Sequence, residues 1–298
     1  MLILKGHQKP ISEIAFSPDG MKLVSAGRDV RLWDLMTGKQ IALQKHFASS
    51  VSFYFDGSMV AIAGKKIILW NIEDDFVSDE LELLPANPFE WDRIQSLDFS
   101  PKGKHLIATI TGGFGCWQWK GGRWKLTWNH TGWRDGRVAC SPNRPTLAIG
   151  SIIKVPNKCN AVDIWNLKTG KRVASIPERG PYWTCRTTSL AYSPDGTMLA
   201  GACGRDLVVW DSSTLKEIFC FKSSGTFFQS AAFSPDNQVL AAVNNDKSVR
   251  TWDTATWKAG NTYDWEIGKL LDIAYSPDGM RAAACSNTGK IIIWDIVT

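Results

Sequence analysis

Three arginines recur at one position relative to a short turn. Arg93, Arg134 and Arg186 each stand six residues before the residue that precedes a Ser-Pro turn, in three successive turns of the chain. Their guanidinium groups present planar, paired donors that match the oxygens of carboxylates and phosphates. Aromatic side chains that would keep water away lie in the same segments, at Trp91, Trp133, Tyr182 and Trp183. The pattern predicts a surface that binds an acidic or phosphorylated peptide.

The same position before the other four turns holds a proline, two phenylalanines and a lysine: Pro10, Phe47, Phe227 and Lys269. We include Phe227 and Lys269 in the predicted partner-binding surface. An alternative stays open, in which the aromatic side chains pack on neighbouring loops and the arginines pair with nearby acids, namely Glu90, Asp92, Asp135 and Glu178. Aromatic residues in loops need burial whether or not a partner exists, so the sequence does not choose between the two.

The residue types and their spacing in the sequence give little support for a catalytic site. The four histidines lack the spacing of metal ligands or of a catalytic triad. The acidic residues from Glu73 to Glu82 are expected to form one solvated loop, without a histidine or arginine partner for acid–base work. Seven cysteines, with no Cys-x-x-Cys pair, favour neither a disulfide framework nor a zinc site. We therefore predict a protein that is not an enzyme and that has no cofactor and no metal.

A tryptophan at the end of an apolar run recurs seven times, and these residues lie 37 to 48 positions apart: Trp33, Trp70, Trp117, Trp165, Trp210, Trp252 and Trp294. Several of the runs, such as Ile67-Ile68-Leu69-Trp70, contain no polar residue. A strand with one wet face would alternate, so both faces of these strands are expected to be covered. A period of this length indicates four-stranded blades arranged around an axis.

Each repeat also carries a tight turn 13 to 15 residues before its tryptophan, as in Ser17-Pro18-Asp19-Gly20. Proline fixes the first corner of such a turn, and aspartate with glycine supplies the rest. Short apolar runs stand on both sides, and they are expected to form the first two strands of a blade. The tryptophan run is then the third strand, and a hairpin such as Thr37-Gly38-Lys39 leads into the fourth.

Together these residues resemble the WD-repeat family, across the whole chain. The resemblance implies an all-β, seven-bladed β-propeller of four-stranded antiparallel blades, with residues 1–298 as a single domain. In the family a histidine, a turn aspartate, a strand serine and the tryptophan form a hydrogen-bonded set, and Gly6-His7 supplies that histidine once here. The family also places the arginine-bearing loops on the upper face, around the mouth of a central channel, where peptides bind.

The resemblance implies a scaffold that binds a protein or peptide near the channel mouth and has no chemistry of its own. Two alternatives stay open: a small-molecule-binding or enzymatic propeller that uses the channel mouth, and a structural subunit of a larger assembly. The chain reaches only three residues beyond Asp295, so the last blade lacks a fourth strand of its own. We expect the segment around Leu2-Ile3-Leu4 to supply it and to close the ring.

Composition limits the partners and the location. A net charge of +5 and a pI of 8.8 are mild for a nucleic-acid-binding domain, so nucleic acid is disfavoured. There is no apolar run of membrane-spanning length, and Met1-Leu2-Ile3-Leu4 does not read as a signal peptide. We therefore expect a cytoplasmic monomer that does not interact with membranes.

Overall fold

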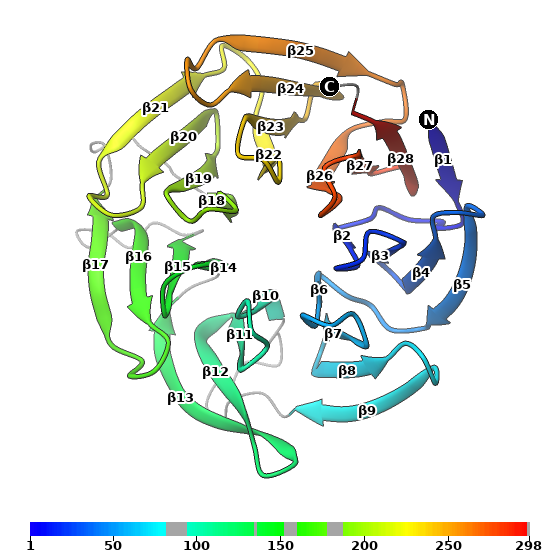
Figure 1. Cartoon of the computed structure of the whole chain (residues 1–298), viewed down its shortest axis with the longest axis vertical. Helices are drawn as coiled ribbons and strands as arrows, with labels where there is room; N and C mark the ends of the chain where they lie inside the picture. Colours follow the sequence, from blue (N-terminus) through cyan, green and yellow to red (C-terminus); the bar gives the residue numbers. More distant parts are fainter. Residues whose placement is uncertain (82–93, 134–135, 152–159, 178–186, 297–298) are drawn as a thin grey trace.

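The computed structural model describes residues 1–81, 94–133, 136–151, 160–177 and 187–296. These residues form 28 strands, β1 to β28, in seven antiparallel sheets of four strands each. The sheets are arranged as blades around a central axis (Figure 1), with the first strand of each blade innermost. The predicted seven-bladed, all-β propeller is confirmed.

The first four blades follow the sequence directly. Blade 1 comprises β2 (Glu13–Phe16), β3 (Lys22–Ala26), β4 (Val30–Asp34) and β5 (Lys39–Gln44). Blade 2 comprises β6 (Ser50–Phe53), β7 (Met59–Ala63), β8 (Ile67–Asn71) and β9 (Phe76–Leu81). Blade 3 comprises β10 (Ile94–Phe99), β11 (His105–Ile110), β12 (Gly112–Lys120) and β13 (Arg123–Trp133). Blade 4 comprises β14 (Gly136–Cys140), β15 (Thr146–Ser151), β16 (Asn160–Asn166) and β17 (Arg172–Pro177).

The last three blades complete the ring. Blade 5 comprises β18 (Thr187–Tyr192), β19 (Met198–Cys203), β20 (Asp206–Asp211) and β21 (Glu217–Lys222). Blade 6 comprises β22 (Phe228–Phe233), β23 (Val239–Asn244), β24 (Ser248–Asp253) and β25 (Ala259–Asp264). Blade 7 comprises β26 (Leu270–Tyr275), β27 (Arg281–Ser286) and β28 (Lys290–Asp295), and β1 (Leu2–Lys5) is its fourth strand.

The ring closes as predicted, by the N-terminal strand. β1 pairs antiparallel with β28, with Leu2 opposite Ile293 and Leu4 opposite Ile291. Leu4 is 1% exposed and packs into the core between blades 7 and 1. The first and last strands of the chain therefore belong to the same blade (Figure 1), and the pairing covers a sheet edge that would otherwise be open.

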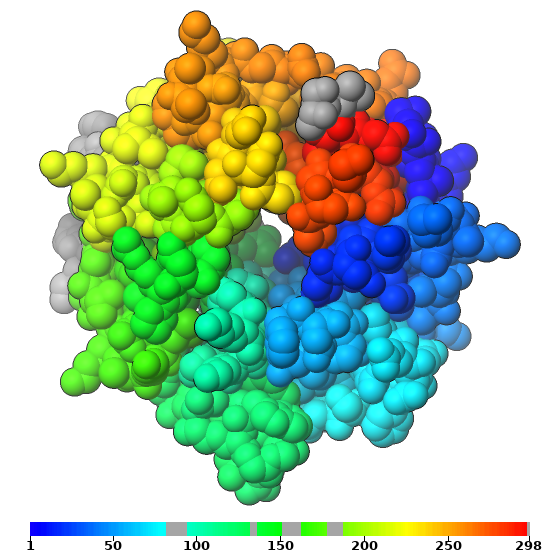
Figure 2. Space-filling model, viewed as in Figure 1, coloured from blue at the N-terminus to red at the C-terminus, as the bar shows by residue number. Residues whose placement is uncertain are grey.

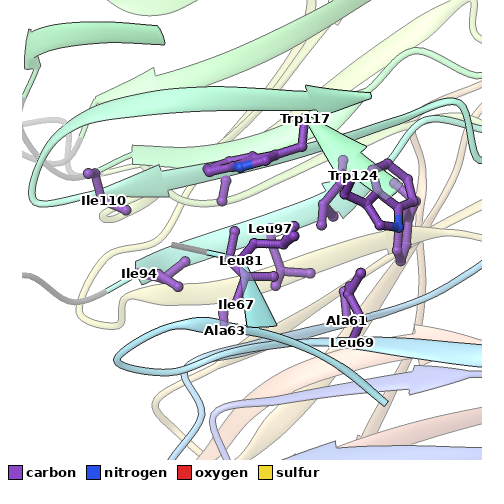
Figure 3. Close-up of a cluster of buried hydrophobic side chains, with 13 residues drawn as sticks. Ala61, Ala63, Ile67, Leu69, Leu81, Ile94, Leu97, Ile110, Trp117 and Trp124 are labelled. Atoms are coloured by element: carbon purple, nitrogen blue, oxygen red, sulfur yellow. The ribbon is translucent and has the colours of Figure 1, made fainter. Parts of the chain in front are cut away.

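The apolar third strands are buried on both faces because each blade packs between two others. In β8, Ile67 and Leu69 belong to the core shared with blade 3, and Ile68 and Trp70 belong to the core shared with blade 1. Figure 3 shows the first of these cores, where side chains from blades 2 and 3 meet beneath Trp117. Alternation along the strand therefore sorts residues between two dry interfaces rather than between core and water.

The predicted tryptophan anchors are buried in six blades and half-buried in the seventh. Trp33, for example, is 2% exposed, whereas Trp294 is half-buried and packs on Trp265 with ring centroids 4.5 Å apart. The difference in burial follows from the way in which β1 closes the ring. β1 pairs with β28 only as far as Ile293, so the fourth strand of blade 7 stops short of its tryptophan.

Blade 1 contains the complete hydrogen-bonded set that the resemblance implies. Trp33 Nε1 donates to Ser25 Oγ at 2.8 Å, His7 Nε2 lies 2.7 Å from the same oxygen, and His7 Nδ1 lies 2.6 Å from Asp29 Oδ1. Burial lowers the pKa of His7 to about 4. A neutral ring that donates through Nδ1 leaves Nε2 to accept from the serine hydroxyl, so the chain of bonds is continuous from tryptophan to carboxylate.

One expectation about the acidic segment is wrong. Residues 73 to 82 do not form a single loop, because Phe76–Leu81 is strand β9, the outer strand of blade 2. Alternating side chains of β9 point away from the blade, and Glu80 pairs with Lys66 at 2.9 Å. A charged outer strand discourages pairing with other chains, which is how exposed sheet edges are commonly protected.

Candidate functional site

The first strands of the blades surround a cavity of about 870 Å³ on the propeller axis. Figure 2 shows the central opening, with all seven blades around it. One position of the first strand is polar in every blade, three residues before the strand's last residue: Glu13, Ser50, Ser96, Arg137, Ser189, Ser230 and Asp272. At this position blades 2, 3, 5 and 6 carry a serine hydroxyl group, and blades 1, 4 and 7 carry a charged side chain.

These polar side chains join neighbouring blades. The first strand of a blade has one edge without a sheet partner, and the preceding blade satisfies its backbone donors through side chains. Leu97 N donates to Ser50 Oγ at 3.1 Å, and Ile14 N donates to Asp272 Oδ2 at 2.9 Å. Unpaired buried amides are costly, so this arrangement fixes the inner strands and makes the channel wall rigid.

Two carboxyl groups of the wall, Glu13 and Asp272, interact electrostatically at the junction of blades 7 and 1. Burial raises the pKa of Glu13 to about 8, and the neighbouring Asp272 carboxylate adds to the rise, while the positive charge of Arg137 opposes it. Burial also raises the pKa of Asp272. Two close carboxylates cannot both ionise cheaply, so the pair holds a proton near neutral pH. On blade 3, burial raises the pKa of Asp98 to about 6.

At one end of the channel lies the upper face, formed by the approach loops, which directly precede the first strands, and by the turns between second and third strands. Backbone hydrogen bonds join each kind of segment to the other. Ala48 N donates to Gly27 O at 2.8 Å, and Phe228 N donates to Gly204 O at 2.8 Å. In the described part of the chain, the turn of blade 1 is thus fixed to the approach loop of blade 2, and the turn of blade 5 is fixed to the start of the first strand of blade 6.

Phe227, a predicted site residue, lies at the channel mouth. It lines the cavity and is 44% exposed, and Arg205 Cζ lies 5.2 Å from the centre of its ring. Its backbone is fixed from both sides by Asn245, whose Oδ1 accepts from Phe227 N and whose N donates to Phe227 O, each at 3.0 Å. An exposed aromatic ring on a rigid backbone is a suitable anchor for a partner.

Lys269, a second predicted site residue, occupies the equivalent position on blade 7. Its side chain is exposed, and its backbone is fixed by Asn287 through two bonds of 2.9 Å. Phe47 on blade 2, at the same position, is 49% exposed. The structure therefore places the described members of the predicted register on the upper face with their side chains exposed.

The structure does not test the binding role of any predicted site residue, and it leaves most of the others undescribed. Trp91, Arg93, Arg134, Tyr182, Trp183 and Arg186 lie outside the described residues, and Trp133 is the last residue of β13. The interpretation of this sector as an anion-binding surface stays a prediction, and so does the alternative in which its charges pair with each other.

Sequence analysis missed a second set of exposed residues on the same face. Arg28, Lys65 and Arg205 each directly follow a glycine at the end of a second strand, and all three are exposed. The sequence contains Gly-Arg or Gly-Lys directly after the second strand in each of these three blades, and this pattern could have identified them. It was overlooked because two of these bases have an acid as their next neighbour, which makes the turns neutral by composition.

No metal or thiol site was found in the described part of the chain. No three His, Cys, Asp or Glu side chains come together there as metal ligands would. Of the described cysteines, four are buried, and burial raises the pKa of the Cys116 thiol to about 12. Such thiols are inert core residues. The described residues also contain no helix that is long and apolar enough to cross a membrane.

Comparison with known families and proteins agrees with this architecture. The family described as "WD domain, G-beta repeat" matches four stretches of the chain, residues 1–34, 180–211, 216–253 and 265–295. The chain is 26% identical to the small ribosomal subunit protein RACK1 of Caenorhabditis elegans over 271 residues, which cover 85% of this chain and 79% of that protein. The Drosophila melanogaster protein of the same name is also 26% identical, over 85% of this chain and 80% of its own length.

A human relative matches this chain over a small part of its own length. Apoptotic protease-activating factor 1 is 25% identical over 260 residues, which cover 80% of this chain but only 19% of that protein. A match to so small a part of a longer protein says nothing about the function of this chain.

Proposed function

Because this chain is a WD-repeat propeller, we propose that it acts as a non-catalytic scaffold that holds a protein or peptide partner on its upper face, near the channel mouth. The observation that carries the proposal is the exposure of Phe47 and Phe227 at the register that surrounds the mouth, together with the backbone of Phe227 that Asn245 fixes. Exposed aromatic residues cost free energy in a monomer, and they are enriched among the residues that dominate binding.

The partner proposed for this face is an acidic or phosphorylated peptide. Arg93, Arg134 and Arg186, with the aromatic residues of the same loops, form the proposed binding sector, and Phe227 and Lys269 extend it around the mouth. Guanidinium groups beside aromatic walls favour anionic groups because their paired donors are shielded from water. We propose that the protein acts as a cytoplasmic monomer with one propeller domain.

The test compares upper-face and outer-strand phenylalanines of similar exposure. Phe47→Ala/Phe227→Ala is expected to lose the partner in affinity capture with mass spectrometry, while stability hardly changes. The control is Phe76→Ala, because Phe76 is 63% exposed but lies on β9, the outer strand of blade 2. If the double variant captures the same partners as the wild type, while Phe76→Ala loses those partners, the upper face is not the binding site.

The cavity supports a second candidate function, the binding of a small molecule in the channel. Its volume of about 870 Å³ is within the range of ligand sites, and hydroxyl groups line it. Native mass spectrometry separates the two candidates. A stoichiometric small molecule that is lost in Ser189→Ala/Ser230→Ala favours the channel, and a bare protein mass together with a captured peptide favours the scaffold.

A further inference from the structure

We propose that four bases on the turns of the upper face, Arg28, Lys65, Arg205 and Lys247, form a basic ring that recognises an acidic segment of the protein partner. This inference rests on the proposed scaffold function and assigns further residues that would recognise its acidic partner. We call these four residues the turn bases. They lie on blades 1, 2, 5 and 6, outside the register that sequence analysis singled out.

The turns are neutral by composition, but the fold separates their charges. Arg28 is followed by Asp29, Arg205 by Asp206, and Lys247 is preceded by Asp246. If both members of each pair faced the solvent, the turns would present no net charge. In each pair, however, the acid is directed into its own blade and the base is left exposed.

The acid of blade 1 is the clearest case. Asp29 accepts from His7 Nδ1 at 2.6 Å and from Arg31 Nη2 at 2.9 Å, as part of the set that anchors Trp33. Hydrogen bonds from Arg31 and the nearby charges hold the pKa of Asp29 below its usual range although burial opposes this. The carboxylate is thus neutralised from within the blade, and Arg28 next to it takes no part.

The other blades reach the same result by different means. Asp246 accepts from Ser248 Oγ at 2.6 Å and from Arg250 Nη2 at 2.7 Å. Asp206 is only 9% exposed. On blade 2 the turn has two lysines, of which Lys66 pairs with Glu80 at 2.9 Å. Within the described part of the chain, Arg28, Lys65 and Lys247 have no ion-pair partner.

The turn bases are placed around the mouth by the backbone. The glycines before Arg28 and Arg205 accept the hydrogen bonds that fix the turns of blades 1 and 5 to the next approach loops, and Gly204 itself lines the cavity. Arg205 Cζ also lies over the ring of Phe227, 5.2 Å from its centre, which is within the range of a cation–π contact. Such a contact uses the face of the guanidinium and leaves its N–H donors for a carboxylate.

An acidic protein segment fits this arrangement better than a nucleic acid. The bases are single residues on separate turns, with an exposed aromatic ring between them at Phe227, rather than a continuous basic track. The chain as a whole carries a net charge of only +5. Carboxylates and phosphorylated side chains would meet the same donors, so the experiment includes both sources.

The test removes the turn bases and compares the result with an equal charge change elsewhere. The variant is Arg28→Gln/Lys65→Gln/Arg205→Gln/Lys247→Gln. The matched control is Lys39→Gln/Lys171→Gln/Lys216→Gln/Lys258→Gln, which removes four exposed lysines from the hairpins between third and fourth strands. All eight side chains are exposed, and circular dichroism checks that both variants fold.

The probes carry a fluorescein label, and their binding is measured by fluorescence anisotropy. They are a glutamate-rich peptide, a serine-containing peptide with and without phosphate, and an RNA oligonucleotide of equal charge. We expect the wild type to bind an acidic peptide with an affinity that falls as salt rises. The turn-base variant should bind at least tenfold more weakly, and the control variant should bind as the wild type does.

The outcomes distinguish this inference from the proposed function. Equal binding by the turn-base and control variants overturns the basic ring, even if Phe47→Ala/Phe227→Ala has lost its partner. Tighter binding of the RNA than of every peptide, abolished in the turn-base variant, also overturns it, because the ring would then serve a nucleic acid. Preference for the phosphorylated over the unphosphorylated peptide supports it and identifies phosphate as the source of the charge.

Discussion

Two junctions between neighbouring blades satisfy a backbone N–H of the inner strand with different acceptor groups. At the junction of blades 7 and 1, where the ends of the chain meet, Asp272 Oδ2 accepts from Ile14 N at 2.9 Å. At the junction of blades 5 and 6, Ser189 Oγ accepts from Ala231 N at 3.4 Å. Asp272 and Ser189 occupy the same position in their blades, so the two junctions differ at this position in having a carboxylate or a hydroxyl group as the acceptor.

The difference shows that hydroxyl groups are sufficient for the geometry. Ser189 also lies 3.3 Å from Ser230 of the next blade, where blades 7 and 1 have Asp272 beside Glu13. Only the carboxyl pair titrates. The junction of blades 7 and 1 is also stabilised by the pairing of β1 with β28 and by the hydrogen bond that Arg281 Nη2 donates to Gly20 O at 2.8 Å. We therefore expect the stability of this junction to depend on pH and on a short terminal strand, and we expect neither dependence at the junction of blades 5 and 6.

The largest effect is expected from removing the strand that closes the ring. Deletion of residues 1–5 removes Leu4 from the core and opens the edge of β28. A lost core leucine alone costs about 2 to 5 kcal/mol. With the lost strand pairing, we expect the melting temperature to fall by about 10 °C or more, since 1 kcal/mol corresponds to about 2 to 4 °C in proteins approaching this size. An unchanged melting temperature in calorimetry would mean that β1 does not hold the ring closed.

Tryptophan anchors should differ between the two junctions. Trp252 is 2% exposed in the core of blades 5 and 6, whereas Trp294 of blade 7 is half-buried. Trp252→Ala should cost about 3 to 5 kcal/mol in urea unfolding, as deletions of large core side chains do. Trp294→Ala should cost clearly less. The reverse order would show that blade 7 is packed as tightly as the continuous blades.

The pH dependence of stability tests the carboxyl pair directly. The pKa of Glu13 is about 8 in the folded protein and about 4.5 when unfolded, so the folded state binds more protons between these values. The contribution of this group is fully present below about pH 4.5 and is lost as the pH rises through about 8. One pKa unit corresponds to about 1.4 kcal/mol, and partial exposure to the channel weakens the effect.

Converting one junction into the other should remove this dependence. We expect the wild type to lose on the order of 1 to 3 kcal/mol between pH 5 and pH 9 from this pair. Glu13→Ser/Asp272→Ser, which copies the residues of blades 5 and 6, should flatten that part of the profile. Glu73→Gln is the control, because Glu73 is exposed. A double variant that keeps the slope of the wild type would place the titrating groups elsewhere.

The smallest effect concerns a buried amide on blade 6. Asn244 is fully buried, and neither its Nδ2 nor its Oδ1 has a hydrogen-bond partner among the described residues. Its counterpart on blade 7, Ser286, is satisfied, since its Oγ donates to Lys290 O at 3.1 Å. Asn244→Ala should raise the free energy of unfolding by about 1 kcal/mol, because an unsatisfied polar group is removed. A loss of stability in urea melts would instead indicate a bound water that satisfies the amide.

The sequence by itself determined the architecture. The seven tryptophan runs, the Ser-Pro-Asp-Gly turns and the period predicted the number of blades, the order of strands and closure by Leu2-Ile3-Leu4. These features are readable because each is local: a turn depends on a few adjacent residues, and an apolar run depends on the burial of one strand. Phe76–Leu81 was wrongly predicted to be part of a loop. It is an outer edge strand, and such a strand contains charged residues and too few buried apolar residues to be recognised from the sequence.

Only the tertiary structure decided which charges meet and which face outward. Ile14 and Asp272 are 258 positions apart, and closure of the ring brings them into contact. Likewise, the sequence Arg28-Asp29 reads as a neutral pair, and only the contacts of Asp29 with His7 and Arg31 leave the base alone at the surface. Electrostatic environment depends on distance in space and on burial, and neither is encoded in the spacing of residues along the chain.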